Sequence, residues 1–196
     1  MSLLSRRISW LLALSMGRLL VCSLLSIKLD YQLRLLMLTL LGWGTTSITL
    51  SDLVYATPDS IFFTPFVQWG LCAEGCSSST FLRIMGRQKA SALILAGSRF
   101  TAQDMDSAGL VTKILAKENF MQEVLGIARG IVKLPKESLK LNKALMMRGM
   151  REELLETNRV ELESLRRQAR SEESGRAIGG YVAETERKRR EKGAKL

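Results

Sequence analysis

At residues 69–77 the chain reads Trp-Gly-Leu-Cys-Ala-Glu-Gly-Cys-Ser, and its glutamate, Glu74, is the only acidic residue between positions 60 and 103. The neighbours of Glu74 are apolar, small or hydroxylic, and the closest cation in the sequence is Arg83. Such surroundings keep water from a carboxylate and raise its pKa toward the range of a general base. Gly75 leaves room for a ligand or for a close backbone approach. From spacing alone, an exposed turn in which Glu74 has no role is the simpler interpretation.

Strand and helix signals surround this stretch. Residues 52–56 and 60–64 are short runs with β-branched and aromatic residues, separated by a turn signal, and they predict two strands or extended segments. Ser77 to Ser79 offer N-cap hydroxyls for a short helix that Gly86 ends, and a second helix over 89–96 stops at a glycine.

The second half of the chain is predicted to be mainly helical. Residues 101–104, Thr-Ala-Gln-Asp, resemble a capping box, and residues 110–115 are a strand candidate. From Glu118 onward almost everything fits a helical pattern, with breaks at Pro135, Gly149 and Ser171. Strands and helices followed by a helical tail indicate the α/β or α+β class.

The composition excludes several classes of site. The chain has 196 residues, 29 Lys and Arg, 19 Asp and Glu and no histidine, which gives a formal net charge of +10. Without histidine there is no Ser-His-Asp or Cys-His nucleophile and no His-containing metal site. We also expect no bound metal. Proton transfer near neutral pH must use Glu, Asp, Lys, Tyr or Cys. The odd cysteine count (Cys22, Cys72 and Cys76), without C-x-x-C spacing, indicates a reducing compartment.

The basic excess does not form a nucleic-acid-binding stripe. Arginines alternate with glutamates between residues 151 and 167, which is typical of a solvated helix face. The denser run at 187–190 could bind phosphates, but a solvated helix end is the simpler interpretation. We expect no nucleic-acid partner, and a basic nucleic-acid or membrane-surface protein stays as an alternative.

Residues 1–41 form a divergent segment rich in Leu, Ser and Arg. The segment has one acid, Asp30, and no apolar run of the roughly 18–20 residues that a membrane span needs. It is compatible with an organelle transit peptide, a membrane-surface helix, or a poorly specified or divergent piece of core.

Seven short stretches after residue 41 carry a family resemblance through their order and spacing, although each alone is weak. They read Gly-Trp-Gly-Thr-Thr at 42–46, Asp-Leu-Val-Tyr-Ala at 52–56, Phe-Phe-Thr-Pro-Phe at 62–66, Gly-Leu-Cys-Ala-Glu-Gly-Cys-Ser-Ser at 70–78, Ile-Met-Gly-Arg-Gln-Lys-Ala at 84–90, Leu-Ala-Gly-Ser-Arg-Phe-Thr-Ala-Gln-Asp at 95–104 and Ala-Gly-Leu-Val at 108–111. From Gly42 onward the chain resembles the enoyl-CoA hydratase/isomerase (crotonase) superfamily, and most of all its peroxisomal Δ3,Δ2-enoyl-CoA isomerases.

The resemblance implies an α/β fold, a crotonase-like ββα spiral that is N-terminally truncated. Residues 42–133 would form a partial crotonase core with the catalytic glutamate. Residues 134–196 would form a C-terminal helical region, which packs between subunits of trimers, and a targeting tail. A homotrimer or hexamer is therefore expected.

The resemblance also implies a reaction on an acyl-CoA. Glu74 would remove a proton from C2 of a 3-enoyl-CoA and return it at C4, while two backbone N–H groups hold the enolate oxygen of the thioester. Family matching puts one of these donors at Trp43 and suggests Phe66, Leu71 and Gly75 for the substrate pocket. No cofactor is implied, because coenzyme A is part of the substrate.

Two positions favour the isomerase branch over the hydratase branch. Hydratases of this family use two glutamates, and the matching positions here are Thr46 and Phe66, neither of which has a carboxylate. One carboxylate suffices for a 1,3-proton shift, whereas hydration normally needs a base and an acid. A hydratase, or a catalytically impaired binding or assembly subunit, remains the alternative.

The sequence before Gly42 departs from the family pattern. Family members have strands there, with a loop that supplies the second oxyanion donor, and here a Leu-rich stretch stands instead. Losing one such donor costs about 10²–10³ in rate, so the chain as written is expected to be weakly active or inactive.

The last three residues suggest a cellular address. Ala194-Lys195-Leu196 is a variant of the Ser-Lys-Leu signal, which implies a peroxisomal import receptor and a peroxisomal location. The Arg-rich N-terminal segment makes a mitochondrial location the alternative. Both fatty-acid β-oxidation and secondary-metabolite acyl processing fit this interpretation.

Overall fold

The computed structural model describes residues 33–36 and 40–193. Within these two ranges, six short strands form two sheets. The first sheet has the order β1 (Leu33–Leu36), β3 (Leu53–Ala56) and β6 (Lys113–Ile114), and the second has the order β2 (Leu40–Leu41), β4 (Ile61–Phe63) and β5 (Phe100–Thr101). All pairs are parallel except β4 with β5.

The order of these strands along the chain produces a spiral. The chain contributes β1 to one sheet and β2 to the other, and then passes through helix α2 (Trp43–Ser47) and the 3-10 turn η1 (Ile48–Leu50). It then repeats the step with β3 beside β1 and β4 beside β2, with Leu33 opposite Leu53 and Leu40 opposite Phe62. The expected ββα spiral is therefore present.

The strands begin earlier than the sequence suggests. Both β1 and β2 precede residue 42, where the sequence places the start of the core. These leucine-rich residues form strands because they pair in parallel with β3 and β4. Other residues of segment 1–41 lie outside the described part of the chain.

Two helices cover the sheets and enclose the main core. Helix α3 (Ser77–Ile94) is broken at Gly86, whose φ of 74° is outside the helical region, so it consists of the two helices predicted around that glycine. Helix α4 (Ala102–Ser107) begins with the predicted capping box between Thr101 and Asp104. The core between these helices and the sheets contains thirteen buried residues, among them Phe62, Phe81, Leu93 and Met105.

The strand predicted over 110–115 is shorter than expected. The N–H of Leu110 donates to the carbonyl of Met105, and the N–H of Gly109, at φ 83°, donates to Asp106. This pair of bonds is a Schellman cap on α4. The residues after Gly109 therefore first complete the helix cap, and the strand itself covers only β6, with the N–H groups of Thr112 and Leu115 donating to β3 on either side of it.

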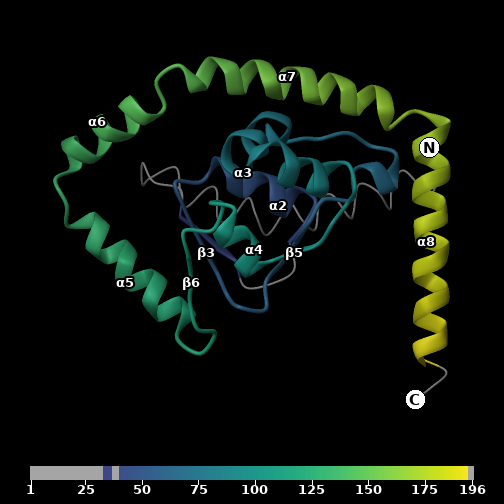
Figure 1. Cartoon of the computed structure of the whole chain (residues 1–196), viewed down its shortest axis with the longest axis horizontal. Coiled ribbons are helices and arrows are strands. Elements are labelled where there is room, and N and C mark those ends of the chain that lie inside the picture. Colours follow the sequence, from purple (N-terminus) through teal and green to yellow (C-terminus); the bar gives the residue numbers. More distant parts are fainter. Residues whose placement is uncertain (1–32, 37–39, 194–196) are drawn as a thin grey trace.

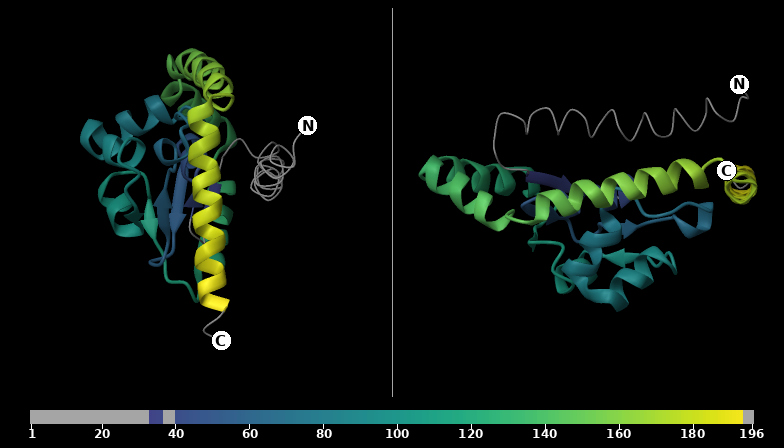
Figure 2. Two further views of the ribbon diagram at one scale, coloured as in Figure 1. Left: turned by 90° about the vertical axis from the view of Figure 1, so that its right-hand side faces the viewer. Right: turned by 90° about the horizontal axis from the view of Figure 1, so that it is seen from above.

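The C-terminal helices follow one another around the outside of the core (Figure 1). They are α5 (Phe120–Val132), α6 (Lys136–Met146), α7 (Met150–Gln168) and α8 (Glu172–Gly193), and they are separated at the predicted breaks. Figure 2 shows α8 as a long rod along one edge of the molecule. Within the described ranges, no helix combines the length and apolar character needed to cross a membrane.

Different parts of the core anchor these helices. Phe120 and Val124 of α5 pack with Tyr55 of β3 and with Leu115. Helix α8 lies against the 3-10 turn η2 (Val67–Trp69), where the rings of Trp69 and Tyr181 meet edge to face with centroids 5.5 Å apart. Helix α7 packs on α3, and this contact reaches the stretch that contains Glu74.

Candidate active site

Glu74 lies in the loop between η2 and α3. Gly70 ends η2 in the left-handed conformation, at φ 61°, and the N–H of Leu71 returns to the carbonyl of Phe66 over 2.7 Å. After Glu74, both Gly75 and Cys76 have φ near 64° before α3 begins. These turns bring the glutamate to the N-terminal end of α3.

The Glu74 carboxylate is partly buried and contacts Thr46 of α2. The Thr46 hydroxyl, which is fully buried, donates to Glu74 Oε1 at 3.4 Å. Burial raises the pKa of Glu74 from its ordinary 4.5 to about 7, the Thr46 bond lowers that pKa, and the negative charge of Glu161 raises it. The desolvation expected from the apolar neighbours of Glu74 is therefore present.

Gly75 packs the loop directly onto α2. A Cβ added there would lie 3.1 Å from Thr46 Oγ1 and 3.1 Å from Cζ3 of the Trp43 ring, and the φ of Gly75 is +64°. Any larger residue would thus push against both side chains and strain the backbone. Gly75 allows the close approach between the Glu74 loop and α2.

Trp43 is the first residue of α2, beside the same loop. Its N–H belongs to the first helical turn, where amides have no carbonyl partner within the helix. Its carbonyl accepts from Thr46 Oγ1 at 3.2 Å. The N–H of Gly42 donates to the carbonyl of Phe63, which fixes the start of α2 to β4.

The structure therefore brings together Glu74, Gly75, Thr46 and Trp43. Phe66 is buried and Leu71 is partly buried, and both belong to the turn that leads into the Glu74 loop. Their role in a substrate pocket stays a prediction. Ala194, Lys195 and Leu196 lie outside the described residues.

A second carboxylate, which the sequence analysis missed, reaches this loop from α7. Glu161 is 6% exposed. Its Oε2 accepts from the N–H of Cys76 at 2.7 Å, and its Oε1 accepts from the N–H of Ser78 at 2.9 Å and from the Ser78 hydroxyl. In the sequence, Glu161 looks like the other glutamates that alternate with arginines between residues 151 and 167. Only the packing of α7 on α3 distinguishes Glu161 from them.

This contact also corrects the predicted start of the helix. The expected cap was a hydroxyl from Ser77 to Ser79, but the N-cap residue is Cys76, which makes no side-chain capping bond. The Ser77 hydroxyl is buried and has no hydrogen-bond partner among the described residues. Because Cys76 is left-handed, the serines enter the helix itself, and Glu161 supplies the cap from α7.

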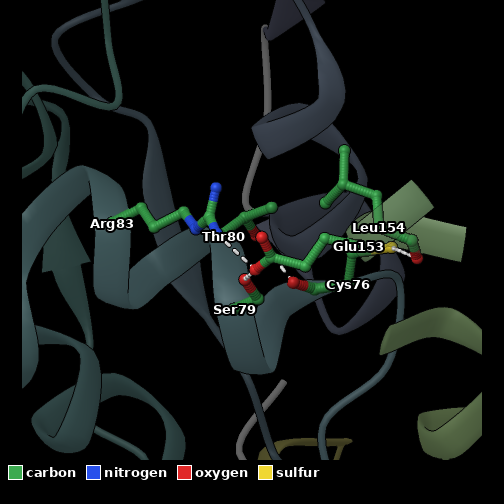
Figure 3. Close-up of polar contacts among 6 residues, drawn as sticks. All are labelled: Cys76, Ser79, Thr80, Arg83, Glu153 and Leu154. Atoms are coloured by element: carbon green, nitrogen blue, oxygen red, sulfur yellow. Dashed lines mark hydrogen bonds and ion pairs between the residues drawn. The ribbon is translucent and has the colours of Figure 1, made fainter. Parts of the chain in front are cut away.

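A second group of contacts joins the first turns of α3 to α7. Glu153 pairs with Arg83 and accepts from the Ser79 hydroxyl at 3.2 Å, and the Cys76 thiol donates to the carbonyl of Leu154 at 3.3 Å (Figure 3). The side chains of Arg83 and Glu153 are nearly half exposed, so this pair contributes little to stability.

Comparison with known proteins gives the family of this chain. Residues 40–190 match the family model described as enoyl-CoA hydratase/isomerase. The chain belongs to the enoyl-CoA hydratase/isomerase family. It is 36% identical over 141 residues to "Enoyl-CoA delta isomerase 2" of Rattus norvegicus, and 33% identical over 142 residues to the Homo sapiens protein of that name.

The matched part covers 72% of this chain and 36% of the length of each of these two relatives. Among solved structures, an enoyl-CoA hydratase/isomerase from Pseudoalteromonas atlantica is similar, with a TM-score of 0.73 and 29% identity over 74% of this chain and 59% of that one. The crotonase fold expected from the sequence is thereby confirmed.

Proposed function

We propose that this enoyl-CoA hydratase/isomerase family member is an isomerase that moves the double bond of a 3-enoyl-CoA to the 2-position. The observation that carries the proposal is the partly buried Glu74, with a pKa of about 7. At neutral pH such a carboxyl group exists in both protonation states, so it can take a proton and give it back. The similarity to proteins named enoyl-CoA delta isomerase 2 supports this choice.

The Thr46 hydroxyl fits both protonation states of Glu74. It has one proton and two acceptors within reach, Glu74 Oε1 at 3.4 Å and the Trp43 carbonyl at 3.2 Å. When Glu74 is a carboxylate, the hydroxyl donates to it. When Glu74 has taken the substrate proton, the carboxyl group donates to Thr46, and the hydroxyl donates to Trp43 instead. No buried polar group then loses its partner during the proton shift.

The Trp43 N–H is the proposed donor to the enolate oxygen. An amide of a first helical turn offers an N–H that the helix itself does not use, and partial positive charge gathers at that end. A donor placed where negative charge develops typically lowers the barrier by about 3–4 kcal/mol. The carbonyl bond from Thr46 and the Gly42 bond to β4 support the orientation of this amide.

Hydration is disfavoured because, among the described residues around this loop, a second free carboxylate is absent. Thr46 and Phe66 have none, and both oxygens of Glu161 already accept hydrogen bonds from Cys76 and Ser78. One exchangeable carboxyl group supports a 1,3-proton shift.

The proposed function also includes a substrate class, an assembly and a cellular location. An acyl-CoA is the substrate, with Phe66, Leu71 and Gly75 lining its binding site. The chain assembles as a homotrimer or hexamer, and Ala194-Lys195-Leu196 directs it to the peroxisome through an import receptor. Imaging a fluorescent fusion of the chain with and without Leu196 tests the peroxisomal location. An unchanged distribution of the fusion in the cell counts against it.

Glu74→Gln tests the proposed function. The substitution keeps the shape of the side chain and removes its ability to accept a proton. The wild-type conversion of a 3-enoyl-CoA to the 2-enoyl-CoA is expected to be slow, and in Glu74→Gln we expect it to fall by a further factor of about 10²–10⁴, with binding of coenzyme A little changed. Glu163→Gln, on the exposed part of α7, is the matched control and should keep the wild-type rate.

Two results would contradict the proposal. Turnover that survives in Glu74→Gln would place the base elsewhere. A wild-type chain that binds an acyl-CoA without any turnover would favour the binding or assembly subunit.

A further inference from the structure

The loop that presents Glu74 has an unusual backbone. Gly75 and Cys76 are both left-handed, and Cys76 is the only non-glycine residue with positive φ in the described part of the chain. L-residues avoid this conformation because their Cβ crowds the following carbonyl. The conformation persists only when the surrounding structure holds it in place.

The contacts that hold it come from α7. The Cys76 N–H and the Ser78 N–H both donate to Glu161, and the Cys76 thiol donates to the carbonyl of Leu154. Two of the amides at the start of α3 thus point at one carboxylate, which lies where the helix dipole favours negative charge. Cys76 itself gives α3 no side-chain cap, so Glu161 takes that place.

We propose that Glu161 is a positioning residue for Glu74: from the C-terminal helix α7 it clamps the loop 74–78 in its left-handed conformation and so aims the Glu74 carboxylate at α2. This inference rests on the proposed function of Glu74. If it holds, the C-terminal helices have two roles. They take part in the proposed assembly, and α7 also fixes the position of the Glu74 carboxylate.

The charge of Glu161 adds a second, measurable effect. The negative charge raises the pKa of Glu74, although less than burial does. The other titratable or charged groups around the loop are Cys72 and Cys76, whose thiol pKa values are raised by burial, Arg167 of α7, and the Arg83–Glu153 pair. Neutralising Glu161 should therefore lower the pKa of Glu74.

Glu161→Gln, compared with Glu153→Gln, separates positioning from simple docking of α7. Both variants remove a carboxylate that joins α7 to α3, but only Glu161 contacts the loop 74–78. For Glu161→Gln we expect kcat to fall about 10- to 100-fold with a smaller change in KM, because the Glu74 carboxylate is no longer held in the geometry that proton transfer needs. We also expect the acidic limb of the pH–rate profile to move to lower pH. Glu153→Gln should keep the wild-type rate and profile.

A titration of the Glu74 carboxyl group by ¹³C NMR makes the test independent of turnover. In Glu161→Gln the Glu74 midpoint should shift to lower pH even if the chain has no isomerase activity. If the wild-type chain has no turnover but Glu161→Gln shows this shift, the proposed function is rejected, while the electrostatic effect of Glu161 on Glu74 is retained.

Ser78→Ala serves if Glu161→Gln does not fold, because it removes one of the three donors to Glu161 and leaves both amides in place. It should give a smaller loss of kcat in the same direction. The proposal is overturned if Glu161→Gln and Glu153→Gln lower the melting temperature alike while the rate, pH profile and Glu74 midpoint stay at wild-type values, or if Ser78→Ala has no effect on kcat.

Discussion

At the scale of single residues, the proposed proton transfer depends on how Glu74 is surrounded. The sequence contains the signal for this, because an acid with apolar and small neighbours and no cation closer than Arg83 predicts desolvation. The hydrogen bond of Glu74 with Thr46 and the effect of the Glu161 charge on Glu74 involve residues 28 and 87 positions away, and no local pattern predicts them. The sequence thus indicates which residue is chemically unusual, while the folded chain determines what surrounds it.

Thr46→Val tests the hydroxyl that contacts Glu74. Valine has nearly the same shape but cannot donate, so the bond that lowers the pKa of Glu74 is lost and that pKa rises above its wild-type value. Less of the base form then exists at pH 7, and we expect turnover at that pH to fall about tenfold. The acidic limb of the pH–rate profile should move to higher pH. Thr46→Ser, which keeps the hydroxyl, is the control, and an unmoved profile in Thr46→Val would contradict the role of this bond.

At the scale of helices and strands, local signals worked where the backbone conformation depends on one or two residues. The break at Gly86 and the capping box of Thr101 with Asp104 are local, and both are present. The start of α3 and the length of β6 were predicted wrongly, because a left-handed Cys76 and a Schellman cap after α4 override the local preference. Both corrections occur where a helix end is completed by bonds that propensity does not describe.

At the scale of the whole molecule, the C-terminal helices leave many apolar side chains in contact with solvent. They are Met121, Leu125, Val132, Leu134, Leu141, Leu145, Met146, Leu155, Val160 and Leu162 on α5 to α7 and the segment that joins α5 to α6. Apolar surface of this extent is typical of an interface. The assembly proposed from the family resemblance would cover it.

Leu141→Glu tests this assembly. Leu141 is 61% exposed on α6, and a charge placed in an apolar interface would have to be desolvated. We expect sedimentation velocity to give an oligomer for the wild-type chain and a smaller species for Leu141→Glu. Leu95→Glu is the control, because Leu95 is 65% exposed and belongs to the C-cap of α3 and not to α5, α6 or α7. A monomeric wild-type chain, or equal effects of the two substitutions, would count against the assembly.

The most direct test of the central claim is the titration midpoint of the Glu74 carboxyl group in the wild-type chain, measured by ¹³C NMR with Glu74→Gln to assign the signal. We expect a midpoint near pH 7, because burial raises the pKa of Glu74 more than the bond from Thr46 lowers it. A midpoint near the ordinary glutamate value of 4.5 would mean that the carboxylate is fully hydrated, and it would contradict Glu74 as the group that takes and returns the substrate proton.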